Sequence, residues 1–132
     1  MAYIATNPKR LLGTSVGTGQ CVAFVQAAAM AGPTRRWSRG ELVKGAKLAI
    51  GTAIATFDDK GKYISNTGGL SHAAIYMGQD ALGIQVLDQY GVTTKGADGK
   101  PLRVPVSVSA RTIFFGKKPK AVNDGRNYYV ID

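Results

Sequence analysis

The chain has 132 residues, of which 45% are hydrophobic and 19% charged, and this composition excludes a disordered or low-complexity protein. Lys and Arg number 17 against 8 Asp and Glu, and the net charge of +9 predicts attraction to polyanions such as nucleic acids, anionic membranes or acidic cell-wall polymers. The single cysteine excludes an internal disulfide bond. The length predicts one domain over residues 1–132, and we expect a monomer.

No apolar run approaches the roughly 20 residues that a membrane span needs. The first ten residues also lack the charged-then-apolar order of a secretory signal peptide. We therefore expect a protein that is made in the cytoplasm and has no transmembrane segment. Delivery to the periplasm or to the outside would then use a secretion route that does not read such a signal.

The pattern of residues 1–45 predicts helices and loops. Residues 1–18 are interrupted by proline and glycine and indicate a loop with room for one helical turn. Residues 21–30 are almost all apolar and lie between Gly19 and the pair Gly32-Pro33, which predicts a buried helix of about ten residues. In residues 34–45, Ser38 with Glu41 forms a weak capping signal, which predicts a second short helix or a turn.

From residue 48 onward the pattern changes to short strands. β-branched residues and alternation, separated by turns rich in Gly, Asp and Asn, are typical of antiparallel strands. The turns are expected at 58–62, 65–69, 79–83 and 96–100, and the strands at 48–57, 72–78, 84–90, 104–108, 111–115 and 128–131. Helices followed by antiparallel strands indicate the α+β class.

Cys21 stands at the beginning of the predicted buried helix. A cysteine in the first turn lies against unpaired backbone N–H groups and the positive end of the helix dipole, which favour the thiolate over the thiol. This makes Cys21 a candidate nucleophile. The alternative is a small, inert core residue, because free cysteines are among the most buried residues.

His72 is the only histidine and opens one predicted strand, while Asp88 lies in the next. A short turn between two strands of this length would bring Asp88 alongside His72, and an acid beside an imidazole orients it and stabilises its protonated form. Gln85 and Gln89 are alternatives for this third position, and a surface histidine or a turn aspartate is the plainer interpretation. One Cys and one His fall short of a closed zinc site, so no metal and no cofactor are expected.

Three segments together resemble the CHAP and NlpC/P60 group of papain-like cysteine peptidases and amidases. They are Gly19-Gln20-Cys21-Val22-Ala23-Phe24-Val25, Gly51-Thr52-Ala53-Ile54-Ala55 and Ser71-His72-Ala73-Ala74-Ile75-Tyr76, in this order. The resemblance covers residues 13–90, and Thr52 departs from it because an acidic residue is frequent there. It implies a papain-like NlpC/P60 core over a single domain, in which N-terminal helices pack on a small antiparallel sheet or half-barrel.

The resemblance also implies roles for particular residues. Cys21 would be the nucleophile, His72 the general base and Asp88 the orienting residue, and the Cys21 backbone N–H with Gln20 would stabilise the oxyanion. Substrate contacts are expected at Gly19, where backbone can approach closely, and at Ser71. Trp37 is a further candidate for lining the substrate groove, although packing on the first helix is the favoured role.

The group mostly hydrolyses amide bonds in peptidoglycan peptides, so this reaction is expected here. A small amidase without a signal peptide also resembles effectors that bacteria inject into the periplasm of rivals, which would give it an immunity protein as partner. Two alternatives stay open. One is acyl transfer or protein deamidation by the same thiol, and the other is a basic binding domain without catalysis, although no nucleic-acid-binding motif is present and nucleic acid is not the expected partner.

Overall fold

A computed structural model of the chain describes residues 2–65, 70–116 and 120–132. One α-helix, α1 (Cys21–Ala29), packs on a single six-stranded sheet in which every neighbouring pair is antiparallel. The strand order is β1-β6-β2-β3-β4-β5. The strands are β1 (Arg39–Leu42), β2 (Ala53–Ala55), β3 (Ala73–Gln79), β4 (Gly83–Lys95), β5 (Pro101–Phe114) and β6 (Tyr129–Ile131). The α+β class predicted from the sequence is confirmed.

Helix α1 covers one face of the sheet. It begins at Cys21 and ends at Ala29, after which Met30 takes the left-handed conformation with φ of 54°. Phe24 and Val25 are completely buried against small and branched strand residues on this face, which include Ala53, Ala55, Ala73, Ile75 and Leu87. Because many of these residues are alanines, the helix can lie close to the strands. The helix predicted over 21–30 is therefore correct to within one residue.

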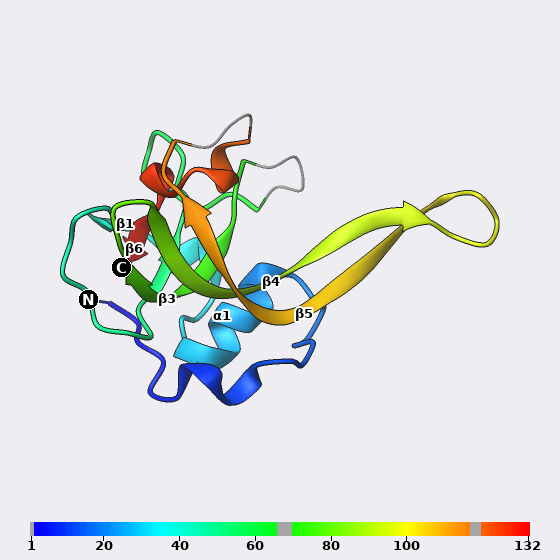
Figure 1. Ribbon diagram of the computed structural model, residues 1–132, viewed down its shortest axis with the longest axis horizontal. Helices are drawn as coiled ribbons and strands as arrows, with labels where there is room; N and C mark the ends of the chain where they lie inside the picture. Colours follow the sequence, from blue (N-terminus) through cyan, green and yellow to red (C-terminus); the bar gives the residue numbers. More distant parts are fainter. Residues whose placement is uncertain (1, 66–69, 117–119) are drawn as a thin grey trace.

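The opposite face carries a second apolar cluster. Ile54, Ala74 and Val86 point to this side, as the two-residue period of a strand requires, and Tyr128 and Val43 pack against them. Two 3₁₀ turns, Ala121–Asn123 and Gly125–Asn127, precede β6. In Figure 1 the strands run between α1 and these orange-to-red turns.

Strands β4 and β5 form one long hairpin, paired from Gly83 with Phe114 to Lys95 with Pro101. Figure 1 shows that its far half, in yellow, extends beyond the body of the molecule. The near half of β4 is largely buried, whereas the far half of the hairpin exposes apolar side chains that include Val92 and Leu102. The sequence predicted the separate strands 84–90, 104–108 and 111–115, and the structure joins the last two and lengthens all of them.

Two predicted elements are corrected. Of the short helix or turn predicted over 34–45, the structure has a 3₁₀ turn at Thr34–Arg36, but strand β1 follows it in place of an α-helix. The capping signal fails because the Ser38 hydroxyl and backbone instead bond with Asp132, which draws this segment into pairing with β6. The strand predicted at 48–57 is reduced to Ala53–Ala55, because Thr52 bonds back to Ala49 and forms a turn.

The N-terminal region thus contributes one α-helix in place of several, together with the 3₁₀ turn Pro8–Leu11. The predicted turn at 58–62 is present, with Asp58 Oδ1 accepting from the backbone N–H groups of Lys60 and Lys62. The loop predicted at 65–69 lies outside the described residues except for Ser65. Among the helices that the structure describes, none is long and apolar enough to cross a membrane.

Candidate active site

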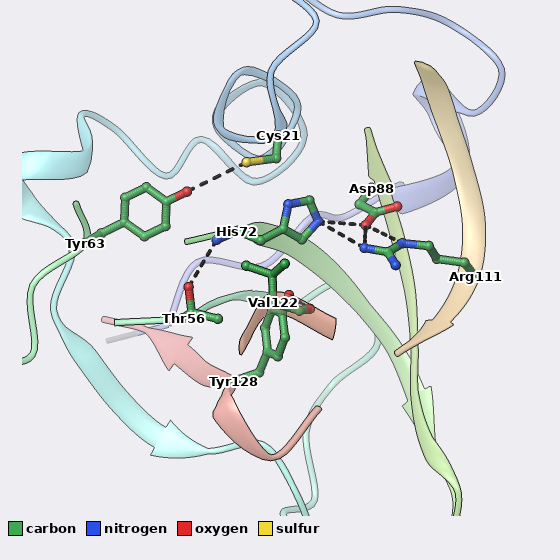
Figure 2. A network of polar contacts seen from close by, with 8 residues as sticks. All are labelled: Cys21, Thr56, Tyr63, His72, Asp88, Arg111, Val122 and Tyr128. Atoms are coloured by element: carbon green, nitrogen blue, oxygen red, sulfur yellow. Dashed lines mark hydrogen bonds and ion pairs between the residues drawn. The ribbon is translucent and has the colours of Figure 1, made fainter. Parts of the chain in front are cut away.

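Cys21 is the first residue of α1, and its half-buried thiol faces the end of the sheet where β3 begins (Figure 2). Burial alone would raise the pKa of this thiol. The hydrogen bond and charge of His72, with contributions from the Ala73 backbone and the Tyr63 hydroxyl, outweigh burial and lower the pKa below its ordinary value. The arrangement therefore favours a thiolate.

His72 lies directly before β3 and is buried. Its backbone is held by Thr56 through two bonds of 3.0 Å, from His72 N to Thr56 Oγ1 and from Thr56 N to the His72 carbonyl. Its Nε2 lies 2.7 Å from Asp88 Oδ2, which leaves Nδ1 as the ring nitrogen available to Cys21. Figure 2 shows the imidazole between the thiol and the carboxylate.

The surroundings of His72 favour its protonated form. Burial by itself lowers the pKa of the imidazole, but the hydrogen bonds to Asp88 and Cys21 and the charges of both residues raise it to about 9. A lowered thiol pKa beside a raised imidazole pKa is the condition for a thiolate–imidazolium pair near neutral pH. Such a pair supplies a nucleophile and an acid in one contact.

Asp88 is completely buried in β4, where an ionised carboxylate needs partners. Arg111 on β5 provides them, with Nε and Nη2 at 2.8 and 2.7 Å from Asp88 Oδ2, the same oxygen that faces His72. Burial raises the pKa of Asp88, but the hydrogen bonds and charges of His72 and Arg111 bring it below its usual value. Asp88 is therefore ionised and can hold His72 in its protonated form.

Sequence reasoning missed Arg111. The β4–β5 register pairs Val86 with Arg111 and Asp88 with Ser109, so Arg111 sits diagonally across from Asp88 on the same face. Arg111 could have been found only from the β4–β5 hairpin and its register, which the sequence pattern did not predict.

Tyr63 was also missed. Its hydroxyl lies 3.7 Å from Cys21 Sγ, and its ring packs on Trp37 with centroids 5.0 Å apart. Burial and the neighbouring Cys21 charge raise the pKa of the phenol strongly, so it stays protonated and can donate a hydrogen bond. The residue follows a turn and carries no motif, and its position depends on packing against Trp37.

The structure separates the three candidates for the residue next to His72. Asp88 contacts the imidazole. Gln89 points instead to the segment before α1, where its side chain bonds to the backbone of Val16 and Gln20 at 2.8 to 2.9 Å. Gln85 lies near the start of β4, where its Nε2 donates to Asp80 Oδ2 at 3.4 Å.

Two of the residues expected at the substrate are corrected. Trp37 is completely buried, with its Nε1 donating to the Ala31 carbonyl at 2.8 Å, so it supports Tyr63 and does not line a groove. Gly19 is also buried, and an added Cβ would lie 2.6 Å from the Pro105 Cβ. Its lack of a side chain, together with its φ of 82°, therefore serves close packing on β5.

The remaining predicted residues lie at the surface near the thiol. Gln20 is the exposed residue before the helix, directly beside Cys21. Ser71 lines a cleft of about 390 Å³ together with Phe57, Ile64 and Leu70. In the part of the chain that the structure describes, no three His, Cys, Asp or Glu side chains are grouped as a metal site would require.

Comparison with known proteins assigns the chain to a family. Residues 1–131 match the family "Dae2: Domesticated amidase effector 2". The chain belongs to this family. It is 41% identical over 93 residues to a "Type VI secretion amidase effector 2 protein" of Salmonella typhi, a match that spans 68% of each chain.

The fold is also similar to that of a solved amidase effector. The structure of "Type 6 secretion amidase effector 2 (Tae2)" superposes with a TM-score of 0.75 at 32% identity, covering 98% of this chain and 94% of the other. The predicted membership in a family of amidases is thereby confirmed. The narrower CHAP or NlpC/P60 assignment stays a prediction.

Proposed function

We propose that this protein is an antibacterial effector that hydrolyses amide bonds in peptidoglycan peptides with Cys21 as its nucleophile. The observation that carries the proposal is the contact of Cys21, at the start of α1, with His72, which in turn contacts Asp88. The chain that contains this arrangement belongs to an amidase effector family. The charge of +9 supports binding to an anionic cell wall.

The first step is acylation of the thiol. The Cys21 thiolate attacks the carbonyl carbon of the scissile amide, and a C–S bond forms as the carbonyl oxygen becomes an oxyanion. His72 then gives its Nδ1 proton to the departing nitrogen, the C–N bond breaks, and the amine leaves. Asp88 holds the ring by its Nε2 throughout this step.

The second step is hydrolysis of the thioester. The neutral imidazole of His72 takes a proton from a water molecule, whose oxygen attacks the acyl carbon. The C–S bond breaks, the carboxylic acid leaves, and the thiolate–imidazolium pair is restored. Overall, one water is consumed for each amide bond.

We infer three hydrogen-bond donors for the oxyanion. The Cys21 backbone N–H lies at the helix start, where such groups have no partner within the helix. Gln20 lies next to it and has an amide donor. The Tyr63 hydroxyl, next to Cys21 Sγ, is a third donor that the phenol's raised pKa keeps protonated.

The biological setting follows from the relatives. We infer a type VI secretion route, consistent with the name of the Salmonella typhi relative, and an immunity protein as protective partner. We also infer a papain-like core related to the NlpC/P60 group, organised as a single, monomeric domain over residues 1–132.

The test is digestion of purified peptidoglycan by the wild type and by Cys21→Ala, with the released fragments identified by mass. Cleavage by the wild type alone, with one new amine and one new carboxylate per cut, is the expected result. Equal cleavage by both proteins, or no cleavage by either, would refute the proposed function.

A further inference from the structure

A second cleft begins at His72 and extends past Arg111 along the hairpin. Its volume is about 490 Å³, and its lining comes from β4, β5 and the segment around Lys120. Cys21 is not among its lining residues. In Figure 2 His72 lies between Cys21 and Arg111, and the cleft is lined by His72 and Arg111.

The lining of this cleft is positively charged. Arg103, Arg111 and Lys120 contribute to it, and none of the ten described residues that form it is acidic. Arg111 is paired with the completely buried Asp88. Arg103 and Lys120 therefore add positive charge beyond what this pair balances, and a concave surface concentrates their field.

The Arg103 side chain lies close to the backbone of the neighbouring strand. A Cβ added at Gly91 would lie 2.6 Å from Arg103 Nε and 3.1 Å from its Cζ. The Arg103 side chain therefore passes close over Gly91 on the neighbouring strand, and both residues line the cleft. Arg111 is likewise placed over the ring of Tyr90, 5.5 Å from its centroid.

The position of His72 decides which part of a substrate would enter. The acid that protonates the departing nitrogen must lie within hydrogen-bond reach of it. The departing nitrogen lies at Nδ1, between the ring and Cys21, so the part of the substrate attached to that nitrogen would extend past the imidazole into the cleft that starts at His72. An amino acid that is acylated on its α-amine carries a carboxylate on the adjacent carbon unless it is amidated or extended.

We propose that this cleft binds a free carboxylate on the amine side of the scissile amide, with Arg103 as the main contact and Lys120 as the second cation. The inference rests on the proposed amidase function and specifies its substrate. Arginine suits this task because its planar fork matches a carboxylate with two parallel hydrogen bonds. Peptides whose carboxylates are amidated would be poor ligands.

The test measures binding, so that it does not depend on turnover. The Cys21→Ala protein is titrated by calorimetry with a cross-linked muropeptide and with the same muropeptide after conversion of its carboxylates to carboxamides. We expect at least about 10-fold tighter binding of the carboxylate form, which corresponds to about 1.4 kcal/mol. Equal binding of both forms would overturn the inference.

A matched pair of charge variants locates the effect. In the Cys21→Ala background, Arg103→Gln should weaken binding of the carboxylate form by about 10-fold and leave the carboxamide form unchanged, while Arg103→Lys should restore part of the loss. Lys47→Gln removes one charge from an exposed residue outside the cleft and should change neither affinity by more than about 2-fold. Equal losses in Arg103→Gln and Lys47→Gln would show a general charge effect and overturn the inference.

The proposed function and this inference fail in different ways. Inactive wild type in the digestion test would refute the amidase function, whereas loss of discrimination in the calorimetry would refute the cleft's role in an enzyme that still cuts. The rate of Cys21 alkylation in an otherwise wild-type Arg103→Gln protein should equal that of the wild type. A changed rate would mean that Arg103 acts on the thiol and would contradict the assignment.

Discussion

Asp88 and Gln89 are consecutive residues of β4, and their side chains hold two different parts of the site. Asp88 accepts hydrogen bonds from His72 and Arg111. Gln89 bonds to the backbone of Val16 and Gln20, in the segment that leads into α1. One short piece of a strand thus fixes both the imidazole and the start of the helix that carries Cys21.

Replacement of Gln89 by leucine should destabilise the fold. The change removes three hydrogen bonds, among them the one in which the Val16 N–H donates to the Gln89 side chain, so we expect a loss of about 3 kcal/mol in the free energy of unfolding. Urea denaturation measures it. Gln85→Leu on the same strand, where one 3.4 Å bond is lost, is the control and should cost less than about 1 kcal/mol. Similar losses in both variants would contradict the role of Gln89.

The wild type should show a bell-shaped dependence of kcat/KM on pH. The alkaline side should fall near pH 9, because His72 has its pKa raised to about 9 and loses the proton that the leaving amine needs. The acid side should fall as the Cys21 thiolate is protonated, below the ordinary thiol pKa. Hydrolysis rates measured across this range would contradict the ion pair if activity kept rising above pH 9.

Asp88→Asn should move the alkaline side to lower pH. The carboxylate raises the pKa of His72, so its loss lowers that pKa, and the nearby Arg111 guanidinium adds to the effect once it is unpaired. We also expect kcat/KM to drop by roughly 100-fold, the size of a general acid–base contribution. The pH profile separates this role from a purely structural one, because simple misfolding would lower the rate without shifting the curve.

Tyr63→Phe tests the third oxyanion donor. The ring would still pack on Trp37, so stability should change little, while kcat should fall by about 10- to 100-fold with KM nearly constant. Tyr129→Phe, which alters a half-buried phenol in β6, is the control and should leave kcat unchanged. A rise in KM with kcat unchanged would argue against an oxyanion role for Tyr63.

The elements that local sequence defines were predictable. Helix α1 is bounded by Gly19 and by Gly32-Pro33, and its apolar run allows little else. The approach of Asp88 to His72 followed from two strands and a short turn. The roles of these residues, and of Cys21 and Gln20, stay predictions that the experiments above address.

The elements that depend on distant partners were not predictable. Strand β1 forms because the chain end, β6, pairs with it, and the weak helix signal at Ser38 loses to this pairing. Tyr63 reaches Cys21 because it packs on the buried Trp37. Arg111 reaches Asp88 through a hairpin register that no local pattern sets.

The most direct test of the central claim is the pH dependence of Cys21 alkylation by iodoacetamide, measured by intact mass in the wild type and in His72→Ala. We predict that the wild-type rate follows a thiol pKa clearly below the free-cysteine value of about 8.5. His72→Ala should raise this pKa, because it removes the hydrogen bond and charge that lower it and leaves the effect of burial, which raises it. A wild-type pKa at or above the ordinary value, or one that His72→Ala leaves unchanged, would contradict a nucleophile activated by His72.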